Sequence, residues 1–239
     1  MHRLAIYDMD KTITAKPTWT RFLLHVARAR APWRLGLLPV VGLGGMAYLL
    51  RRIDRAGLKR LSHRLLLGRA LPPAEMTAVA EAFAELELRK GVLQGARAQI
   101  EADRAAGYRL VMATASHRYY AEAIGRQLGF DDVIATNAKR DGQGHILSEL
   151  EGENCYGPVK LHMVENWLAG EGLHRANCYV RAYSDHVSDA PLLGWADEAF
   201  AVNAHGPLAK LATARGWTQL DWRHADPGRA ANPIVPAEG

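Results

Sequence analysis

The sequence predicts an α/β fold in which helices cover a mostly parallel sheet. Short apolar segments with strand character alternate along the chain with longer segments of helical periodicity. The chain has 239 residues, of which 49% are hydrophobic, which is enough for one large core and a smaller module. The smaller module is expected from a long helical insertion, residues 15–90, that follows directly after the first strand.

The first strand is expected at residues 3–7, where the sequence is short and mostly apolar. It leads into Asp8-Met9-Asp10-Lys11-Thr12, so two carboxylates lie one residue apart where the strand ends. Paired carboxylates repel each other, and burying them without a partner is costly. A divalent cation is the usual remedy, so the run indicates a metal-assisted acid/base or nucleophilic site. The alternative is a simple turn in which aspartate acts as a turn former.

The insertion at residues 15–90 has the pattern of several helices. Apolar residues recur at helical spacing in three of its parts, and Pro72-Pro73 separates the last helix from the others. The three sets are Phe22, Leu23 and Val26; Leu58, Leu61 and Leu65; and Val79, Ala82, Phe83 and Leu86.

The remaining elements follow in alternation. A helix of about fifteen residues is expected before a strand at 108–113, and Gly129 ends the next helix, at 119–128. A short strand at 133–136 precedes a turn-rich segment, 139–145, that predicts a hairpin tip. A helix that contains Lys160, strands at 178–183 and 199–202, and a helix at 207–214 complete the fold. Residues 224–239 are rich in Pro, Gly and Ala and are expected to form a loose tail.

Three later segments place polar residues where strands end or helices begin. Residues 110–116 form an apolar strand that ends in small hydroxyl residues, the first of which is Thr114. Residues 157–160 read Gly-Pro-Val-Lys, which places Lys160 in the first turn of a helix. The strand at 178–183 leads to Asp185, and Asp189 follows four residues later. Because ligands of open α/β sheets bind beyond the carboxyl ends of the strands, these groups are expected to share one crevice with Asp8.

In this order the four segments resemble the four motifs of the haloacid dehalogenase (HAD) superfamily of phosphohydrolases, in particular its phosphoserine-phosphatase-like branch, subfamily IB. The resemblance covers residues 1–14 and 91–215. It implies a Rossmann-like core domain of residues 1–14 and 91–223 and a helical C1-type cap domain of residues 15–90. It also implies a phosphomonoester hydrolase that depends on Mg²⁺.

The resemblance also implies roles for the aspartates. Asp8 would be the nucleophile that forms an aspartyl-phosphate, and Asp10 would protonate the leaving oxygen and then deprotonate the attacking water. Mg²⁺ would be held by Asp8, the backbone carbonyl of Asp10 and Asp185. Asp189 would bind the ion through water or orient its ligands, or it would cap the helix that begins after it.

The phosphoryl group would be bound by Thr114 and the adjacent Ala115, and Lys160 would neutralise the charge that develops on it. Each assignment has a structural alternative. Thr114 could cap the segment that begins at Ser116, and Lys160 could be a solvated surface lysine. His186 could contact the substrate or be a structural histidine with local partners.

The basic charge of the chain is concentrated in the insertion. Residues 21–69 contain eleven basic residues and a single acid, Asp54, whereas the whole chain carries a net charge of +5. Residues 35–50 within this segment carry no charge, although the run is shorter than the ~20 residues of a spanning helix. It could be buried in the cap, form a dimer interface, or contact a membrane whose anionic head groups meet the arginines. The cap is similar in this respect to that of bacterial phosphatidylglycerophosphatase C.

The sequence does not determine the substrate. Phosphoserine phosphatases carry an acidic residue shortly after the first motif to meet the substrate ammonium, whereas residues 14–19 here contain none. The alternatives are a membrane-associated lipid-phosphate phosphatase, a phosphotransferase that uses the same residues, and a catalytically silent binder of anionic lipid or RNA. Retention of every motif residue argues against the silent binder, and the cap lacks the interleaved aromatic residues typical of nucleic-acid binding.

Cellular location is suggested by the two cysteines. Cys155 and Cys178 show no paired metal-binding spacing, so neither a zinc site nor a disulfide framework is expected. We therefore expect a cytoplasmic protein, peripheral at the inner face of the membrane if the cap binds lipid. Its expected partner is a phosphorylated small molecule or lipid, and the oligomeric state is not predicted.

Overall fold

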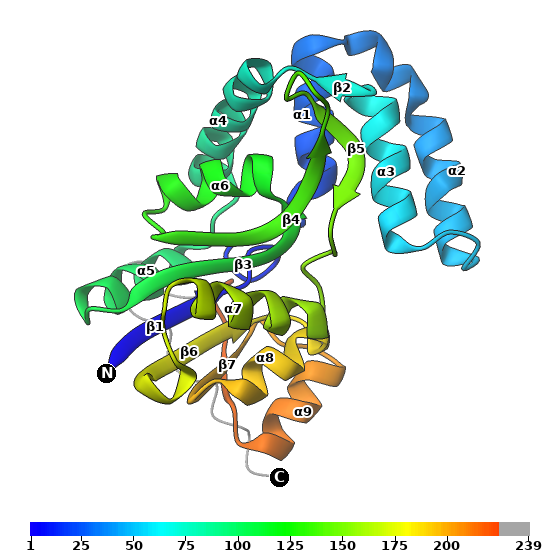
Figure 1. Ribbon diagram of the computed structural model, residues 1–239. Helices are drawn as coiled ribbons and strands as arrows, with labels where there is room; N and C mark the ends of the chain where they lie inside the picture. The colour runs from blue at the N-terminus through cyan, green and yellow to red at the C-terminus, as the bar shows by residue number, and fades with distance from the viewer. Residues whose placement is uncertain (225–239) are drawn as a thin grey trace.

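The computed structural model describes residues 1–224, apart from the side chain of Arg55. The tail expected at residues 224–239 therefore lies outside the described residues except for its first position. Helices lie on both faces of a central sheet, and a group of further helices projects beyond one end of it (Figure 1). This arrangement confirms the α/β fold class.

Within the described residues, eight strands form one sheet in the order β2-β5-β4-β3-β1-β6-β7-β8. Neighbouring strands from β4 to β8 are parallel, whereas β5 is antiparallel to both β4 and β2. Strand β1 lies between β3 and β6, so three carboxyl ends meet at the centre of one edge. The strands are β1 (His2–Tyr7), β2 (Ala70–Leu71), β3 (Arg109–His117), β4 (Asp132–Arg140), β5 (Ile146–Glu151), β6 (Cys178–Ser184), β7 (Glu198–Val202) and β8 (Thr218–Leu220).

Each face of the sheet has its own apolar cluster, because alternate residues of a strand point to opposite faces. Ala5 and Tyr7 of β1 belong to the cluster beneath α5 and α6, and Leu4 and Ile6 to the cluster beneath α7, α8 and α9. Burial on both faces explains why the β1 sequence is a nearly continuous apolar run. These helices are α5 (Gln94–Ala105), α6 (Arg118–Gln127), α7 (Pro158–Gly170), α8 (Ala190–Trp195) and α9 (Pro207–Arg215).

The insertion is helical, as predicted. Its elements are α1 (Thr18–Arg30), the 3-10 turn η1 (Pro32–Leu37), α2 (Leu38–Leu49), α3 (Arg55–Leu66) and α4 (Pro73–Lys90). Asp54 caps α3 by accepting a hydrogen bond from the backbone N–H of Gly57, and Pro73 opens α4. Strand β2 pairs with β5, and α4 packs on α6, so the insertion meets the rest of the chain along this hairpin and helix. We propose residues 15–90 as the cap domain and residues 1–14 with 91–223 as the core domain.

Some element boundaries differ from the expectation. The strand expected at 133–136 runs from Asp132 to Arg140, because it continues as one arm of the hairpin with β5. The helix before β3 has 12 residues instead of about fifteen. Strand β8, which closes the edge beyond β7, was not predicted, since three residues are too few for a periodic pattern.

The uncharged run at residues 35–50 is not buried in the cap. It forms the end of η1 and all of α2, and Leu43 and Leu49 are 70% and 73% exposed. Only Gly44 of α2 is buried, and a Cβ there would lie 2.4 Å from the side chain of Leu61 on α3. The expectation of a buried segment is therefore wrong, because α2 packs through one narrow face. Within residues 1–224, no helix is both long and apolar enough to cross a membrane.

Candidate active site

The candidate site lies where β1, β3 and β6 end side by side. Asp8 follows β1 and its backbone N–H donates to the carbonyl of Tyr183 in β6 over 2.9 Å. Parallel neighbours end at the same edge, so residues more than a hundred positions apart meet here. A cavity of about 190 Å³ is lined by all of the residues that the sequence singled out: Asp8, Asp10, Thr114, Ala115, Lys160, Asp185, His186 and Asp189.

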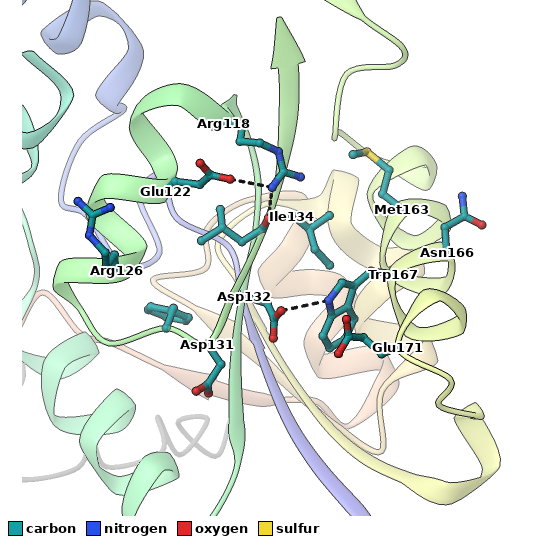
Figure 2. Close-up of a pocket in the computed structure, with 12 residues that line it drawn as sticks. Arg118, Glu122, Arg126, Asp131, Asp132, Ile134, Met163, Asn166, Trp167 and Glu171 are labelled. Atoms are coloured by element: carbon teal, nitrogen blue, oxygen red, sulfur yellow. Dashed lines mark hydrogen bonds and ion pairs between the residues drawn. The ribbon is translucent and has the colours of Figure 1, made fainter. Parts of the chain in front are cut away.

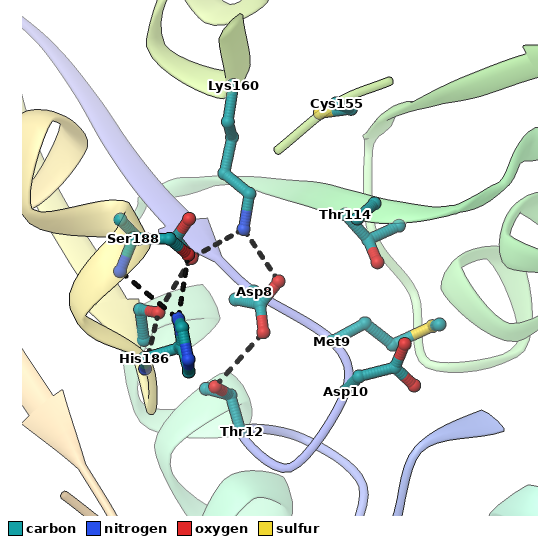
Figure 3. A network of polar contacts seen from close by, with 12 residues as sticks. Asp8, Met9, Asp10, Thr12, Thr114, Cys155, Lys160, His186 and Ser188 are labelled. Atoms are coloured by element: carbon teal, nitrogen blue, oxygen red, sulfur yellow. Dashed lines mark hydrogen bonds and ion pairs between the residues drawn. The ribbon is translucent and has the colours of Figure 1, made fainter. Parts of the chain in front are cut away.

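Lys160 joins two of the aspartates. Its ammonium group donates to Oδ1 of Asp8 over 2.7 Å and to Oδ2 of Asp189 over 2.6 Å (Figure 3). Lys160 is only 2% exposed, so the alternative of a solvated lysine is wrong. Asp189 holds the N-cap position of α8, but its side chain makes no capping bond. It instead accepts hydrogen bonds from the ammonium of Lys160 and the hydroxyl of Ser184.

Thr12 connects the first and last motifs. Its Oγ1 lies 3.4 Å from Oδ2 of Asp8 and 3.3 Å from Oδ1 of Asp185, and it accepts the backbone N–H of Asp185 over 2.9 Å. A hydroxyl donates one proton, so it can satisfy only one of the two carboxylates at a time. Thr12 lies within the first motif, but no role was predicted for it. Its position two residues after Asp10 was the only signal.

The charges at the site are strongly coupled. Burial raises the pKa of Asp8 to about 7, against the opposing effect of the Lys160 ammonium, and the nearby Asp189 and Asp185 raise it further. Burial alone would lower the pKa of Lys160, but Asp189 and Asp8 raise it above its ordinary value, so the ammonium stays charged. Burial also raises the pKa of Asp185.

The carboxylate of Asp10 has a separate set of partners. Its Oδ1 accepts the backbone N–H and the hydroxyl of Thr18, over 2.7 and 2.8 Å, and its Oδ2 accepts the hydroxyl of Ser116 over 2.8 Å. Figure 3 shows it beside Asp8 but outside the contact with Lys160. Thr18 opens α1 of the insertion, so the cap itself orients Asp10. Neither Thr18 nor Ser116 was predicted, because nothing in their local sequence distinguishes them from ordinary helix-start and strand residues.

The loop that carries Asp10 has a constrained backbone. Lys11 has a φ of 64°, in the left-handed region that non-glycine residues seldom adopt. Its carbonyl accepts a hydrogen bond from the side-chain amide of Asn203 over 2.9 Å, and Asn203 in turn accepts the backbone N–H of Trp222. The C-terminal part of the core therefore holds the first motif in shape. The sequence gives no sign of this contact, which spans 192 residues.

Thr114 and His186 both reach the cavity and both have local partners. Oγ1 of Thr114 accepts the backbone N–H of Ser116 over 3.1 Å, although helix α6 begins only at Arg118. Nδ1 of His186 lies 2.9 Å from the hydroxyl of Ser188 and accepts its backbone N–H over 3.1 Å. The structural alternative for each residue is therefore observed, and each still lines the cavity.

The oxygen atoms at the site suit a hard cation such as Mg²⁺. Asp8 and Asp185 direct carboxylate oxygens at the same hydroxyl of Thr12, and Oδ1 of Asp189 is buried with no hydrogen-bond partner in the described part of the chain. Mg²⁺ takes oxygen ligands and keeps several waters, so it needs few carboxylates. Among residues 1–224, no group of three His, Cys, Asp or Glu side chains gathers as a complete metal cluster. The donor set thus fits an ion held by two carboxylates, a backbone carbonyl, water and phosphate.

A second hollow, of about 680 Å³, lies between α6, β4 and α7 (Figure 2). Several of its polar residues are paired: Arg118 with Glu122 and Arg126 with Glu81, and the indole N–H of Trp167 donates to Asp132. Asp132 begins β4, so part of this hollow lies at the edge opposite the paired aspartates. None of the predicted site residues lines it, and we assign it no chemistry.

Comparison with known proteins identifies the class. Residues 5–194 match the haloacid dehalogenase-like hydrolase family, and the chain belongs to this family. It is 31% identical over 226 residues to the "Inhibition of morphological differentiation protein" of Streptomyces azureus, a match that covers 91% of this chain and 78% of the relative. It is also 31% identical over 184 residues to a phosphoserine phosphatase of Mycobacterium tuberculosis, covering 77% of this chain and 58% of that protein.

Solved structures show the same fold. A protein of unknown function from Bordetella pertussis Tohama I superimposes with a TM-score of 0.83 at 26% identity, over 93% of this chain and 99% of its own. A phosphoserine phosphatase that carries an analogue of its phospho-aspartyl intermediate superimposes with a TM-score of 0.59 at 17% identity, over 94% of this chain and 95% of its own, and shows the fold alone. The predicted family and enzyme class, a phosphatase of the HAD superfamily related to phosphoserine phosphatases, are confirmed.

Proposed function

We propose that this chain hydrolyses phosphomonoesters through an aspartyl-phosphate on Asp8. A carboxylate oxygen of Asp8 attacks phosphorus, the bond from phosphorus to the ester oxygen breaks, and Asp10 gives a proton to that leaving oxygen. Water then attacks phosphorus, Asp10 takes its proton, and the bond to Asp8 breaks to release phosphate. Division of the reaction in this way replaces one difficult step with two easier ones.

The observation that carries the proposal is the division of labour between the paired carboxylates. Asp8 contacts the buried ammonium of Lys160. This charge would stabilise the nucleophilic carboxylate of Asp8 and then the oxygens of the phosphoryl group that is transferred to Asp8. Asp10 is held by three hydrogen bonds from Thr18 and Ser116 at the mouth of the cap, where the leaving group would lie. Different environments for two adjacent carboxylates are typical of a nucleophile and a general acid/base.

Mg²⁺ bound by Asp8, Asp185 and the carbonyl of Asp10 would neutralise phosphate charge and hold the phosphoryl group in line. Lys160 supplies a second positive charge from the other side of Asp8 and is itself held in place by Asp189. Thr114 and Ala115 are proposed to bind phosphoryl oxygens at the end of β3. A phosphotransferase would use the same residues, with an alcohol in place of water.

The residues that follow the first motif bear on which phosphomonoester is the substrate. Relatives include proteins named phosphoserine phosphatase, but residues 14–19 contain no acid that could meet an amino group. Pro17 and Trp19 instead form an apolar wall beside Asp10. We therefore propose free phosphoserine as a poor substrate.

A second candidate is the hydrolysis of lipid phosphates at an anionic bilayer, favoured by the exposed apolar side chains of α2. Leu43, Met46 and Leu49 are all more than half exposed, and Arg51 and Arg52 follow directly. A helix that combines an exposed apolar side with nearby cations can lie at the surface of a membrane. A silent lipid or RNA binder is disfavoured, because it has no use for a buried lysine between two carboxylates.

The test is a phosphatase assay with para-nitrophenyl phosphate, sugar phosphates, nucleotides and phosphoserine, in Mg²⁺ and in excess EDTA. We expect Mg²⁺-dependent release of phosphate that EDTA abolishes and added Mg²⁺ restores, since the acidic cluster needs a cation. Asp185→Asn is expected to lower activity at least tenfold and to raise the Mg²⁺ concentration needed for half-maximal rate.

Glu165→Gln is the matched control, because Glu165 is an exposed carboxylate on α7. It should retain wild-type activity and the wild-type response to Mg²⁺. Full activity in excess EDTA would remove the ion from the proposed function. Equal losses in Asp185→Asn and Glu165→Gln would remove Asp185 from the site.

A further inference from the structure

We propose that the cavity between the cap helices and Asp10 is a leaving-group site for one aliphatic chain, so that the substrate is a phosphate monoester of a long-chain alcohol or single-chain lipid. This inference rests on the proposed function. The cavity has a volume of about 520 Å³ and is lined by α1, α2 and α3 on one side and the end of β3 on the other. Volumes of this size are typical of sites that enclose small molecules.

The cavity adjoins the catalytic one. Both are lined by Asp10, Pro17, Ala115, Tyr156 and His186. The phosphoryl group is proposed to lie against Asp8 and Lys160, and Asp10 protonates the ester oxygen. The alcohol part of the substrate must therefore extend past Asp10, which is the direction in which the larger cavity opens.

The lining is rich in apolar side chains, which suits an aliphatic chain. Leu23, Leu38, Val41, Leu58, Leu66 and Trp19 form a large apolar part of its wall. Asp10 is the only acidic residue among the described residues that line it, so no second carboxylate is present to bind an amino group. Lys59 donates to the carbonyl of Ala115 over 2.5 Å and to the side chain of Asn154 over 2.9 Å, which places its charge near the polar end.

Helix α2 contributes one regular row of residues to this wall. Leu38, Val41, Gly45 and Tyr48 are three or four positions apart and share a helix face. A Cβ built on Gly45 meets no atom within 4 Å, so the space beside it is open. The glycine therefore leaves room in the cavity that any larger side chain would occupy.

The experiment is a series of ethyl, butyl, hexyl and octyl phosphate, each below its micelle concentration, with wild-type protein. Burial of each methylene gives about 0.8 kcal/mol, so kcat/KM is expected to rise roughly fourfold for each methylene that enters the cavity. Two variants of α2 then locate the site. Gly45→Leu fills the open space and is expected to lower the ratio of octyl to ethyl kcat/KM at least tenfold.

Gly42→Leu is the matched control. Gly42 lies on the same helix, is exposed, has no atom within 4 Å of a built Cβ, and does not line the cavity. The octyl to ethyl ratio in this variant should stay within about twofold of wild type, as expected for a surface substitution. Circular dichroism of both variants checks that α2 remains helical.

The outcomes separate this inference from the proposed function. A flat chain-length series, or equal effects of Gly45→Leu and Gly42→Leu, overturns the leaving-group site while hydrolysis of para-nitrophenyl phosphate through Asp8 still stands. Absence of Asp8-dependent hydrolysis with every ester overturns the proposed function, and the leaving-group site falls with it. A rising series that Gly45→Leu flattens and Gly42→Leu does not supports the site.

Discussion

The carboxylate of Asp8 has neighbours with opposing effects on its charge. Burial and two nearby aspartates favour its protonated form, whereas Lys160 favours the anion that nucleophilic attack requires. Lys160 in turn remains charged because two carboxylates flank it. Asp189 touches Lys160 and not Asp8, so we propose it as the residue that positions and charges the ammonium.

At this scale, we predict that Asp8→Asn lowers turnover to below about 1% of wild type, because loss of a nucleophile usually costs several orders of magnitude. Asparagine has nearly the same shape, and Lys160 keeps its contact with Asp189, so the fold should be retained. The measurements are para-nitrophenyl phosphate hydrolysis and a thermal melt. A variant that melts normally and keeps more than about 1% of the activity would contradict covalent catalysis at Asp8.

Helix α2 combines a wall of the leaving-group cavity with an apolar exterior. Its row at Leu38, Val41, Gly45 and Tyr48 lines the cavity, while other positions of the same helix expose leucine and methionine to solvent still further. Exposed apolar patches of this kind are typical of surfaces that contact another protein or a membrane. The surrounding segment, residues 21–69, has eleven basic residues and one acid, which suits an anionic bilayer.

For this element, we predict binding to anionic vesicles at low salt that is lost near 1 M salt, where the Debye length falls to about 3 Å. The measurement is co-sedimentation with neutral and phosphatidylglycerol-containing vesicles. Exchange of Leu43 and Leu49 for serine, or of Arg51 and Arg52 for glutamine, should each reduce the bound fraction.

The charge-matched control for this experiment is Arg89→Gln with Lys90→Gln, because both residues are exposed at the end of α4, away from α2. It should bind like wild type. Protein that stays in the supernatant with anionic vesicles at low salt would contradict membrane binding. The exposed apolar side of α2 would then be a candidate surface for contact with a second protein chain.

At the scale of the whole molecule, the cap and core share one apolar cluster. Phe83 of α4 contacts Phe22 of α1 with ring centroids 5.3 Å apart, and Tyr120 of α6 with centroids 5.9 Å apart. All three side chains are fully buried. Thr18, which orients Asp10, also lies 3.1 Å from the hydroxyl of Tyr120, so the same contact region supports both stability and the site.

We therefore predict that Phe83→Ala lowers the free energy of unfolding by about 3–5 kcal/mol, the usual cost of a cavity left by a buried phenylalanine. Urea unfolding followed by tryptophan fluorescence and by circular dichroism should give coincident transitions for wild type, since cap and core are packed together. Glu85→Ala, at an exposed position on α4, should change stability by less than about 0.5 kcal/mol. Two separate transitions would show that the cap unfolds independently.

Much of the site was predictable because strand ends are encoded locally. Apolar runs identify β1, β3 and β6, and polar residues that directly follow them must meet wherever the strands are parallel neighbours. This pattern predicted that Asp8 and Asp185 lie close together, with Thr114 beside them. The roles of Thr12, Thr18 and Asn203 could not be predicted, because each depends on one long-range contact made by an ordinary polar residue.

The sequence by itself determined the α/β class, the helical insertion and the order of the four motifs, since periodicity and strand-end residues are properties of short segments. Only the tertiary structure decided that Lys160 is buried between two aspartates, and that the uncharged run at 35–50 is exposed on one side and lines a cavity on the other. The physical reason is that burial depends on what packs against a segment. A run such as α2 is equally apolar whether it faces a core, a cavity or water.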